Sequence, residues 1–157
     1  MLFRSGPPSR LHRWTINTAG SHLTFTDEQR SDFDADLPSI DRRHTGRPNR
    51  HGWRVETRAA DDDVNLGGAI HIDPVSGAET RWDPGPAIST GEWLFVPTGD
   101  GEGEGVVMTF SYDRSRDASD LVVLDARNIA SGPLARVAIP QRVPYGFHGT
   151  WVSASEL

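Results

Sequence analysis

The 157-residue sequence contains no cysteine, which excludes a disulfide framework as well as zinc–thiolate and iron–sulfur sites. A chain without disulfides suits a reducing compartment, so we expect a cytoplasmic protein. The sequence also lacks an apolar run approaching the ~20 residues of a membrane-spanning helix, and its N-terminus lacks the positive-then-apolar pattern of a signal peptide. We therefore expect a soluble chain.

Positive charge is also in short supply, with 16 basic residues against 22 acidic ones and a formal net charge of −6. A general nucleic-acid binder needs a basic surface to attract phosphates, so we expect no nucleic-acid partner. The remaining composition is ordinary, with 36% hydrophobic and 24% charged residues, but 16 glycines and 11 prolines favour turns and short strands over helices. An all-β fold is therefore predicted.

Short runs of strand-forming residues, some of them alternating between apolar and polar, predict where the strands lie. Such runs, bounded by turn residues, lie at 10–16, 22–26, 50–57, 67–73, 78–83, 93–97, 105–113, 120–126 and 134–140. The last four form a meander of the kind that builds one blade of a β-propeller, in which Val106, Met108, Phe110 and Tyr112 share one face. Residues 1–9 are read as an irregular start and 31–53 as an irregular polar segment of a single partial domain, 1–157.

The stretch Pro144-Tyr-Gly-Phe-His-Gly-Thr-Trp151 carries the first candidate for chemistry. Gly146 and Gly149 allow backbone conformations closed to other residues, so they can present His148 as a metal ligand on a short, rigid loop. An isolated histidine among aromatic residues is more often a hydrogen-bonded structural residue, and both readings stay open on these residues alone. For His12 and His22 the structural reading is favoured because no second ligand lies at i+2 or i+4, and His71 is also read as structural.

The longer segment from Pro133 to Trp151 resembles the C-terminal signature of the carotenoid cleavage oxygenases, which include apocarotenoid-cleaving, stilbene-cleaving and retinoid-isomerising members. The resemblance implies a seven-bladed β-propeller with one non-haem ferrous iron, Fe(2+), held on its axis by four histidines. It puts His148 at the last of these ligands. Phe147, next to it, could line the substrate tunnel, although packing is the simpler role for a buried aromatic residue.

Two further segments resemble the family. Asp36-Leu-Pro-Ser-Ile-Asp41 is similar to its Glu-Phe-Pro-Arg-Ile-Asp segment, whose glutamate accepts the free ring N–H of an iron-bound histidine. Asp36 is one methylene shorter, so the backbone must approach more closely, a water must bridge, or the role is lost. The segment from Gly91 to Pro97 is similar to the family's Glu-Pro-x-Phe-Val-Pro and matches it at Glu92, Phe95 and Pro97.

The resemblance runs from about Leu11 to Trp151, whereas a complete family member is much longer. We therefore expect a fragment of about two C-terminal blades, with the three other iron ligands lying upstream. None of the remaining histidines aligns with those ligands: His12, His22, His44, His51 and His71. Two blades alone leave sheet edges and apolar faces uncovered, so the fragment is expected to be marginally stable and inactive by itself.

The activity implied by the resemblance is insertion of dioxygen across a conjugated C=C bond of an apolar polyene or stilbene, giving two carbonyl products. A cluster of basic residues is expected to be a solvated loop paired with carboxylates, although it could also meet anionic membrane head groups in peripheral contact. It comprises Arg42, Arg43, His44, Arg47, Arg50 and His51. A non-catalytic propeller binding module without iron is the alternative, and a zinc hydrolase is disfavoured because no His-Glu-x-x-His motif occurs.

Overall fold

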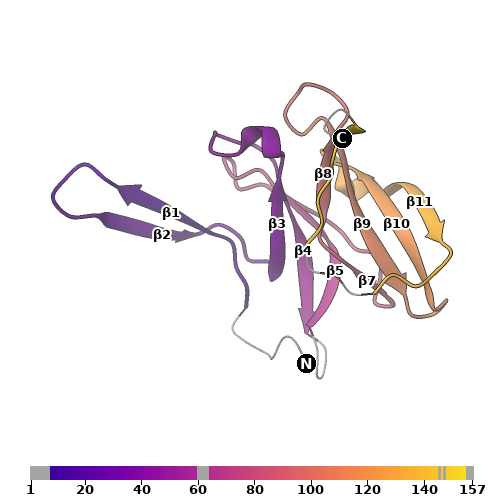
Figure 1. The fold of residues 1–157 in the computed structure, drawn as a ribbon. Coiled ribbons are helices and arrows are strands. Elements are labelled where there is room, and N and C mark those ends of the chain that lie inside the picture. Colours follow the sequence, from indigo (N-terminus) through magenta and orange to yellow (C-terminus); the bar gives the residue numbers. More distant parts are fainter. Residues whose placement is uncertain (1–7, 60–63, 145, 147, 155–157) are drawn as a thin grey trace.

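The computed structural model describes residues 8–59, 64–144, 146 and 148–154, and in this part the chain is built from strands and two short 3-10 turns (Figure 1). The strands are β1 (His12–Asn17), β2 (Thr24–Gln29), β3 (Ala35–Ile40), β4 (Gly52–Ala59), β5 (Val64–Ile72), β6 (Glu79–Trp82), β7 (Ile88–Thr90), β8 (Leu94–Pro97), β9 (Gly105–Asp113), β10 (Ala118–Asp125) and β11 (Pro133–Ile139). The turns are η1 (Arg42–His44) and η2 (Ile129–Ser131). Among the described residues, no helix has the length and apolar character needed to cross a bilayer.

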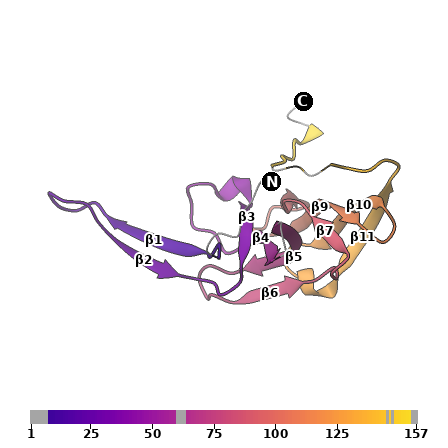
Figure 2. The ribbon, with the colours of Figure 1, turned by 90° about the horizontal axis from the view of Figure 1, so that it is seen from below.

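All strand pairs are antiparallel and form three sheets. Strands β1 and β2 form a separate hairpin that extends away from the body of the molecule (Figures 1 and 2). Strands β3 to β6 follow one another in a four-stranded sheet. In the third sheet β11, β10 and β9 are neighbours, and β7 and β8 pair in turn with the remaining edge of β9.

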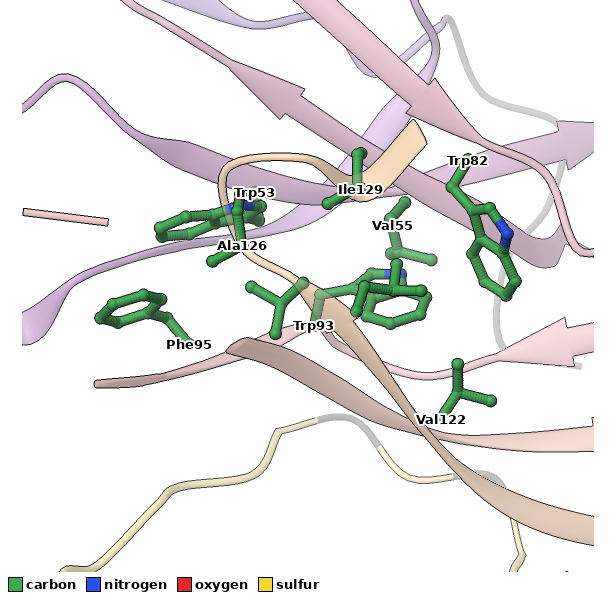
Figure 3. Packing of buried hydrophobic residues seen from close by; sticks show 11 residues of the cluster. Trp53, Val55, Trp82, Trp93, Phe95, Val122, Ala126 and Ile129 are labelled. Atoms are coloured by element: carbon green, nitrogen blue, oxygen red, sulfur yellow. The ribbon is translucent and has the colours of Figure 1, made fainter. Parts of the chain in front are cut away.

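The two larger sheets pack face to face through aromatic side chains (Figure 3). Trp53 of β4 stacks on Phe95 of β8 with ring centroids 4.8 Å apart, and Trp82 meets Trp93 edge-on at 5.6 Å. The indole Nε1 of Trp53 donates to the carbonyl of Ala126 at 2.8 Å, so its polar atom is satisfied inside the core. This is the contact expected between two consecutive blades of a propeller.

The all-β prediction is confirmed, and β8 to β11 form the predicted meander with boundaries shifted by two residues or fewer. The prediction that 31–53 is irregular was wrong for β3, which lies inside it. Its pairing with β4 is interrupted by an irregularity between Asp36 and Ser39, so the sequence shows no clean period of two there. The short strand β7 was also missed, because three residues are too few to show a period.

The long strand β9 turns its more polar side inward. Val107, Thr109 and Ser111 are buried between the sheets, whereas Phe110 on the opposite side is 52% exposed. Phe110 lies on the uncovered face of the sheet, to which Val137 of β11 also belongs through the paired residue Leu121 of β10. The sequence predicted uncovered apolar faces, and Phe110 and Val137 lie on such a face.

A histidine pair closes one end of the aromatic core. His71 of β5 is buried against Trp53, and its Nε2 lies 2.8 Å from Nδ1 of His51, so one ring nitrogen donates and the other accepts. Burial, together with the neighbouring His51, lowers the pKa of His71 to about 4, and burial also lowers the pKa of His51. The structural reading of His71 therefore fits its surroundings.

Stability should fall when the medium becomes acidic. An unfolded His71 takes up a proton near its ordinary pKa of about 6.5, whereas the folded residue resists protonation until about 4. Lowering the pH from about 7 to about 5 should therefore cost about 2 kcal/mol of unfolding free energy through this residue alone. Urea unfolding at the two pH values measures the loss.

The variant His71→Gln can keep a hydrogen bond to His51 but does not titrate, so the pH dependence should flatten. His22→Gln, in the exposed turn of the β1–β2 hairpin, is the matched control. Equal pH dependence in wild type and His71→Gln would contradict this account.

Candidate functional site

The C-terminal tail runs back across the molecule after β11 (Figure 1). The backbone N–H of Val143 donates to Ser119 Oγ at 2.9 Å, which fixes the start of the tail against β10. The tail then passes β8 and reaches the η1 turn, where Arg42 Nη1 donates to Thr150 Oγ1 at 2.6 Å. The segment containing His148 is therefore held between two parts of the chain that are remote in sequence.

His148 lies beside the carboxylate of Glu92. Its Nδ1 is 3.6 Å from Glu92 Oε2, and its side chain is 73% exposed, whereas that of Glu92 is only 13% exposed. The same Glu92 oxygen accepts the backbone N–H of Gly149 at 2.9 Å. The distance from Glu92 Oε2 to the ring nitrogen exceeds that of a hydrogen bond. Glu92 therefore hydrogen-bonds the backbone of Gly149 and lies next to the imidazole without bonding it.

Gly149 packs closely against β8. A Cβ atom at this position would lie 2.9 Å from Cδ1 of Leu94, so a larger residue would require the end of the Leu94 side chain to shift.

The core fixes the position of Glu92. The next residue, Trp93, is fully buried, and its carbonyl accepts the hydroxyl of Ser39 from β3. On the other side, the N–H of Gly91 donates to the carbonyl of Phe110 at 3.1 Å. Because both neighbours are tied to strands, the Glu92 carboxylate is presented from a rigid segment.

The arrangement is chemically suited to a metal ligand. Metal-bound histidines commonly direct their second ring nitrogen at a carboxylate, which fixes the tautomer and orients the ring. With Glu92 on the Nδ1 side, Nε2 of His148 is the nitrogen left for a metal. Within the described ranges no three His, Asp or Glu side chains gather into a metal site, so this part of the chain offers His148 as a single ligand.

The other predicted site residues have different outcomes. Asp36 is exposed on β3, and its carboxylate accepts the N–H of the next residue, Leu37, at 2.8 Å. That local bond stabilises the backbone of Leu37, whose φ of 49° is unusual for leucine. The role of Asp36 in holding a ligand histidine stays a prediction, and Phe147 lies outside the described residues.

Sequence reasoning missed the role of Glu92. Its match to a family motif assigns it no function. The sequence signal for its position is a carboxylate directly before a core tryptophan at the start of a strand. Its contact with Gly149 spans 57 residues of sequence, so no local pattern could reveal the pairing.

The basic cluster is largely used inside the molecule, as expected for a loop paired with carboxylates. Arg43 lies 2.7 Å from the buried carboxylate of Asp41 and also donates to the carbonyl of Gly99 at 2.9 Å. Arg50 pairs with Asp73 at 2.5 Å, and this guanidinium holds the pKa of Asp73 well below its usual range. These contacts tie the loop around η1 to the turns of both large sheets.

Comparison with known proteins gives consistent matches along nearly the whole chain. The family model described as retinal pigment epithelial membrane protein matches residues 3–153. The chain is 34% identical to lignostilbene-alpha,beta-dioxygenase isozyme III of Sphingomonas paucimobilis, over 94% of this chain and 32% of that protein. It is 36% identical to a carotenoid cleavage oxygenase of Mycobacterium tuberculosis, over 90% of this chain and 28% of that protein.

Among solved structures, the cobalt-substituted apocarotenoid oxygenase of Synechocystis matches with a TM-score of 0.84 and 28% identity. The match covers 94% of this chain and 31% of that one. The chain thus spans about a third of the length of the proteins it resembles.

The Glu92 carboxylate should control the order of the tail. We expect Glu92→Ala to speed hydrogen exchange of the Gly149 amide by about 10-fold or more, because a hydrogen bond to a charged acceptor is lost. Amide exchange followed by NMR measures the effect. Glu102→Ala, which removes a carboxylate bonded to the backbone N–H of Arg50, is the matched control and should leave Gly149 unchanged. Unaltered exchange in Glu92→Ala would mean that other contacts hold the tail.

Proposed function

The chain belongs to the family of the retinal pigment epithelial membrane protein, which comprises the carotenoid cleavage oxygenases, and we propose that it forms the C-terminal portion of an iron-dependent dioxygenase. The proposed reaction is oxidative cleavage of a conjugated C=C bond in a carotenoid, apocarotenoid or stilbene, with two carbonyl products. The names of the relatives, a lignostilbene dioxygenase and a carotenoid cleavage oxygenase, support this substrate class. The observation that carries the proposal is the His148 imidazole backed by the Glu92 carboxylate.

In this proposal Nε2 of His148 is one of four histidine ligands of Fe(2+), and the other three come from parts of the protein outside this chain. Neutral imidazoles hold ferrous iron without cancelling its charge, and the bound metal supplies activation of dioxygen. The contribution of this chain is positional. Glu92 would accept a hydrogen bond from the Nδ1–H group and so fix the tautomer that leaves Nε2 free for the metal, while its bond to Gly149 holds the loop.

The substrate in this proposal is an apolar polyene or stilbene, with O2 as the second reactant. Phe147 would line the tunnel beside the ligand, where an apolar wall selects the double bond that lies nearest the metal. A cytoplasmic location with peripheral membrane contact is part of the same proposal, since such substrates partition into lipid. The cations of Arg43 and Arg50 are engaged by carboxylates, which leaves them less available for head groups.

Removing the His148 ring should abolish cleavage in the complete protein. His148→Ala deletes one of four ligands, so iron content measured by elemental analysis should drop together with oxygen-dependent product formation. The β-rich circular dichroism should be retained, because His148 is exposed and lies outside the core. His22→Ala removes an exposed histidine far from the site and is the matched control.

Full iron content and turnover in His148→Ala would end the claim that His148 is a ligand. A complete wild-type protein that folds but binds no iron would favour the non-catalytic propeller module instead. The 157-residue chain alone should bind no iron specifically, because a single imidazole does not make a tight site.

Asp36 offers a separate test. If its carboxylate orients a ligand histidine in the complete protein, Asp36→Ala should weaken iron binding by about 10- to 100-fold. Asp36→Glu, which restores the longer side chain, should bind iron at least as well as wild type. Titration of the metal-free protein with ferrous iron gives the affinities. If Asp36→Ala binds iron like wild type, the carboxylate serves only the local backbone bond to Leu37.

A further inference from the structure

Arg42 differs from its neighbours in the basic cluster by the partner that it binds. Its guanidinium Nη1 donates to the hydroxyl of Thr150 at 2.6 Å, across 108 residues of sequence, and Thr150 lies two residues after His148. Arg43 and Arg50 pair with carboxylates instead. A solvated loop or a head-group contact, the two roles predicted for this cluster from the sequence, leaves the bond to the tail unexplained.

The η1 turn holds the backbone of Arg42 in a fixed position. Asp41, directly before it, is buried, and its carboxylate caps the turn by accepting the backbone N–H of Arg43 at 3.0 Å. The same carboxylate accepts Nη2 of Arg43 at 2.7 Å, and Arg43 also donates to the carbonyl of Gly99, in the loop after β8, at 2.9 Å. The exposed side chain of Arg42 therefore extends from a turn whose two flanking residues are anchored.

Two hydrogen bonds hold the tail at consecutive residues. The Glu92 carboxylate accepts the backbone N–H of Gly149 at 2.9 Å, and Arg42 donates to the hydroxyl of Thr150. One hydrogen bond alone would leave the segment free to rotate about it. The second bond comes from a different part of the fold and removes that rotation, so it sets the orientation of His148 as well as its position.

We propose that Arg42 is a positioning residue for the metal ligand. Its bond to Thr150 directs the ring of His148 towards the metal, and Arg42 itself touches neither metal nor substrate. This role rests on the proposed function, because only there is His148 a ligand. Groups that orient a metal-binding histidine contribute about 10- to 100-fold to metal affinity. Asp41 and Arg43 act on the same site indirectly, since they fix the turn from which Arg42 extends.

Substitutions at Thr150 separate this role from one based on charge. Thr150→Val removes the hydroxyl but leaves the cation of Arg42 in place, whereas Thr150→Ser keeps a hydroxyl that can accept the same bond. A head-group contact needs only the charge of Arg42, so Thr150→Val would leave it untouched. A positioning role needs the bond, so Thr150→Val and Arg42→Ala should have the same effect.

Hydrogen exchange in the complete, metal-free protein tests the contact without iron. Arg42→Ala and Thr150→Val should each speed exchange of the peptide that contains Gly149 by about 5-fold or more, as measured by mass spectrometry, because a hydrogen bond from a charged donor is lost. The double variant should exchange no faster than either single one, since both remove the same bond. Thr150→Ser should match wild type, and so should Arg47→Ala, the matched control in the same basic cluster.

Titration of the complete protein with ferrous iron is the second measurement. Arg42→Ala and Thr150→Val should weaken iron binding by about 10-fold or more, while Thr150→Ser and Arg47→Ala should bind iron as wild type does. Wild-type exchange and wild-type iron affinity in Arg42→Ala would overturn the positioning role and leave His148 as a ligand. A complete wild-type protein that binds no iron would instead reject the proposed function, and with it any positioning role towards a metal.

Discussion

The packing of four aromatic side chains between the two large sheets is the constraint on which the rest depends. Trp53 stacks on Phe95 and Trp82 meets Trp93, so both sheets are joined by contacts that no single sheet could make. The site is rigid because this core holds the segment that carries Glu92. Trp93 is fixed by burial, and Glu92, directly before it in the segment that leads into β8, is therefore held in place.

Contacts from three segments remote in sequence then fix the position of the candidate ligand, His148. The carboxylate of Glu92, just before β8, accepts the backbone N–H of Gly149, and Arg42 of the η1 turn donates to the hydroxyl of Thr150. Ser119 of β10 accepts the backbone N–H of Val143 at the start of the tail. The imidazole of His148 needs no regular structure of its own, because its neighbours on both sides of the tail are anchored. This arrangement explains why a histidine on an irregular and largely exposed segment can be presented in a defined position.

Much of the fold was predictable because short runs of strand-forming residues bounded by turn residues are a local signal, and β8 to β11 show it. The bulged β3 and the three-residue β7 lack that signal, and the polar inner face of β9 shows that alternation identifies two faces without saying which is buried. His148 was found through a motif that resembles a family, whereas Glu92 acquires its meaning only through a long-range contact.

The most direct measurement is a crystal structure of the complete protein with ferrous iron, using anomalous scattering to locate the metal. The account predicts that Nε2 of His148 coordinates the iron and that the Glu92 carboxylate accepts a hydrogen bond from Nδ1, with the Gly149 bond retained. An iron site without His148, or a His148 whose Nδ1 faces the metal while Glu92 stands apart, would contradict it.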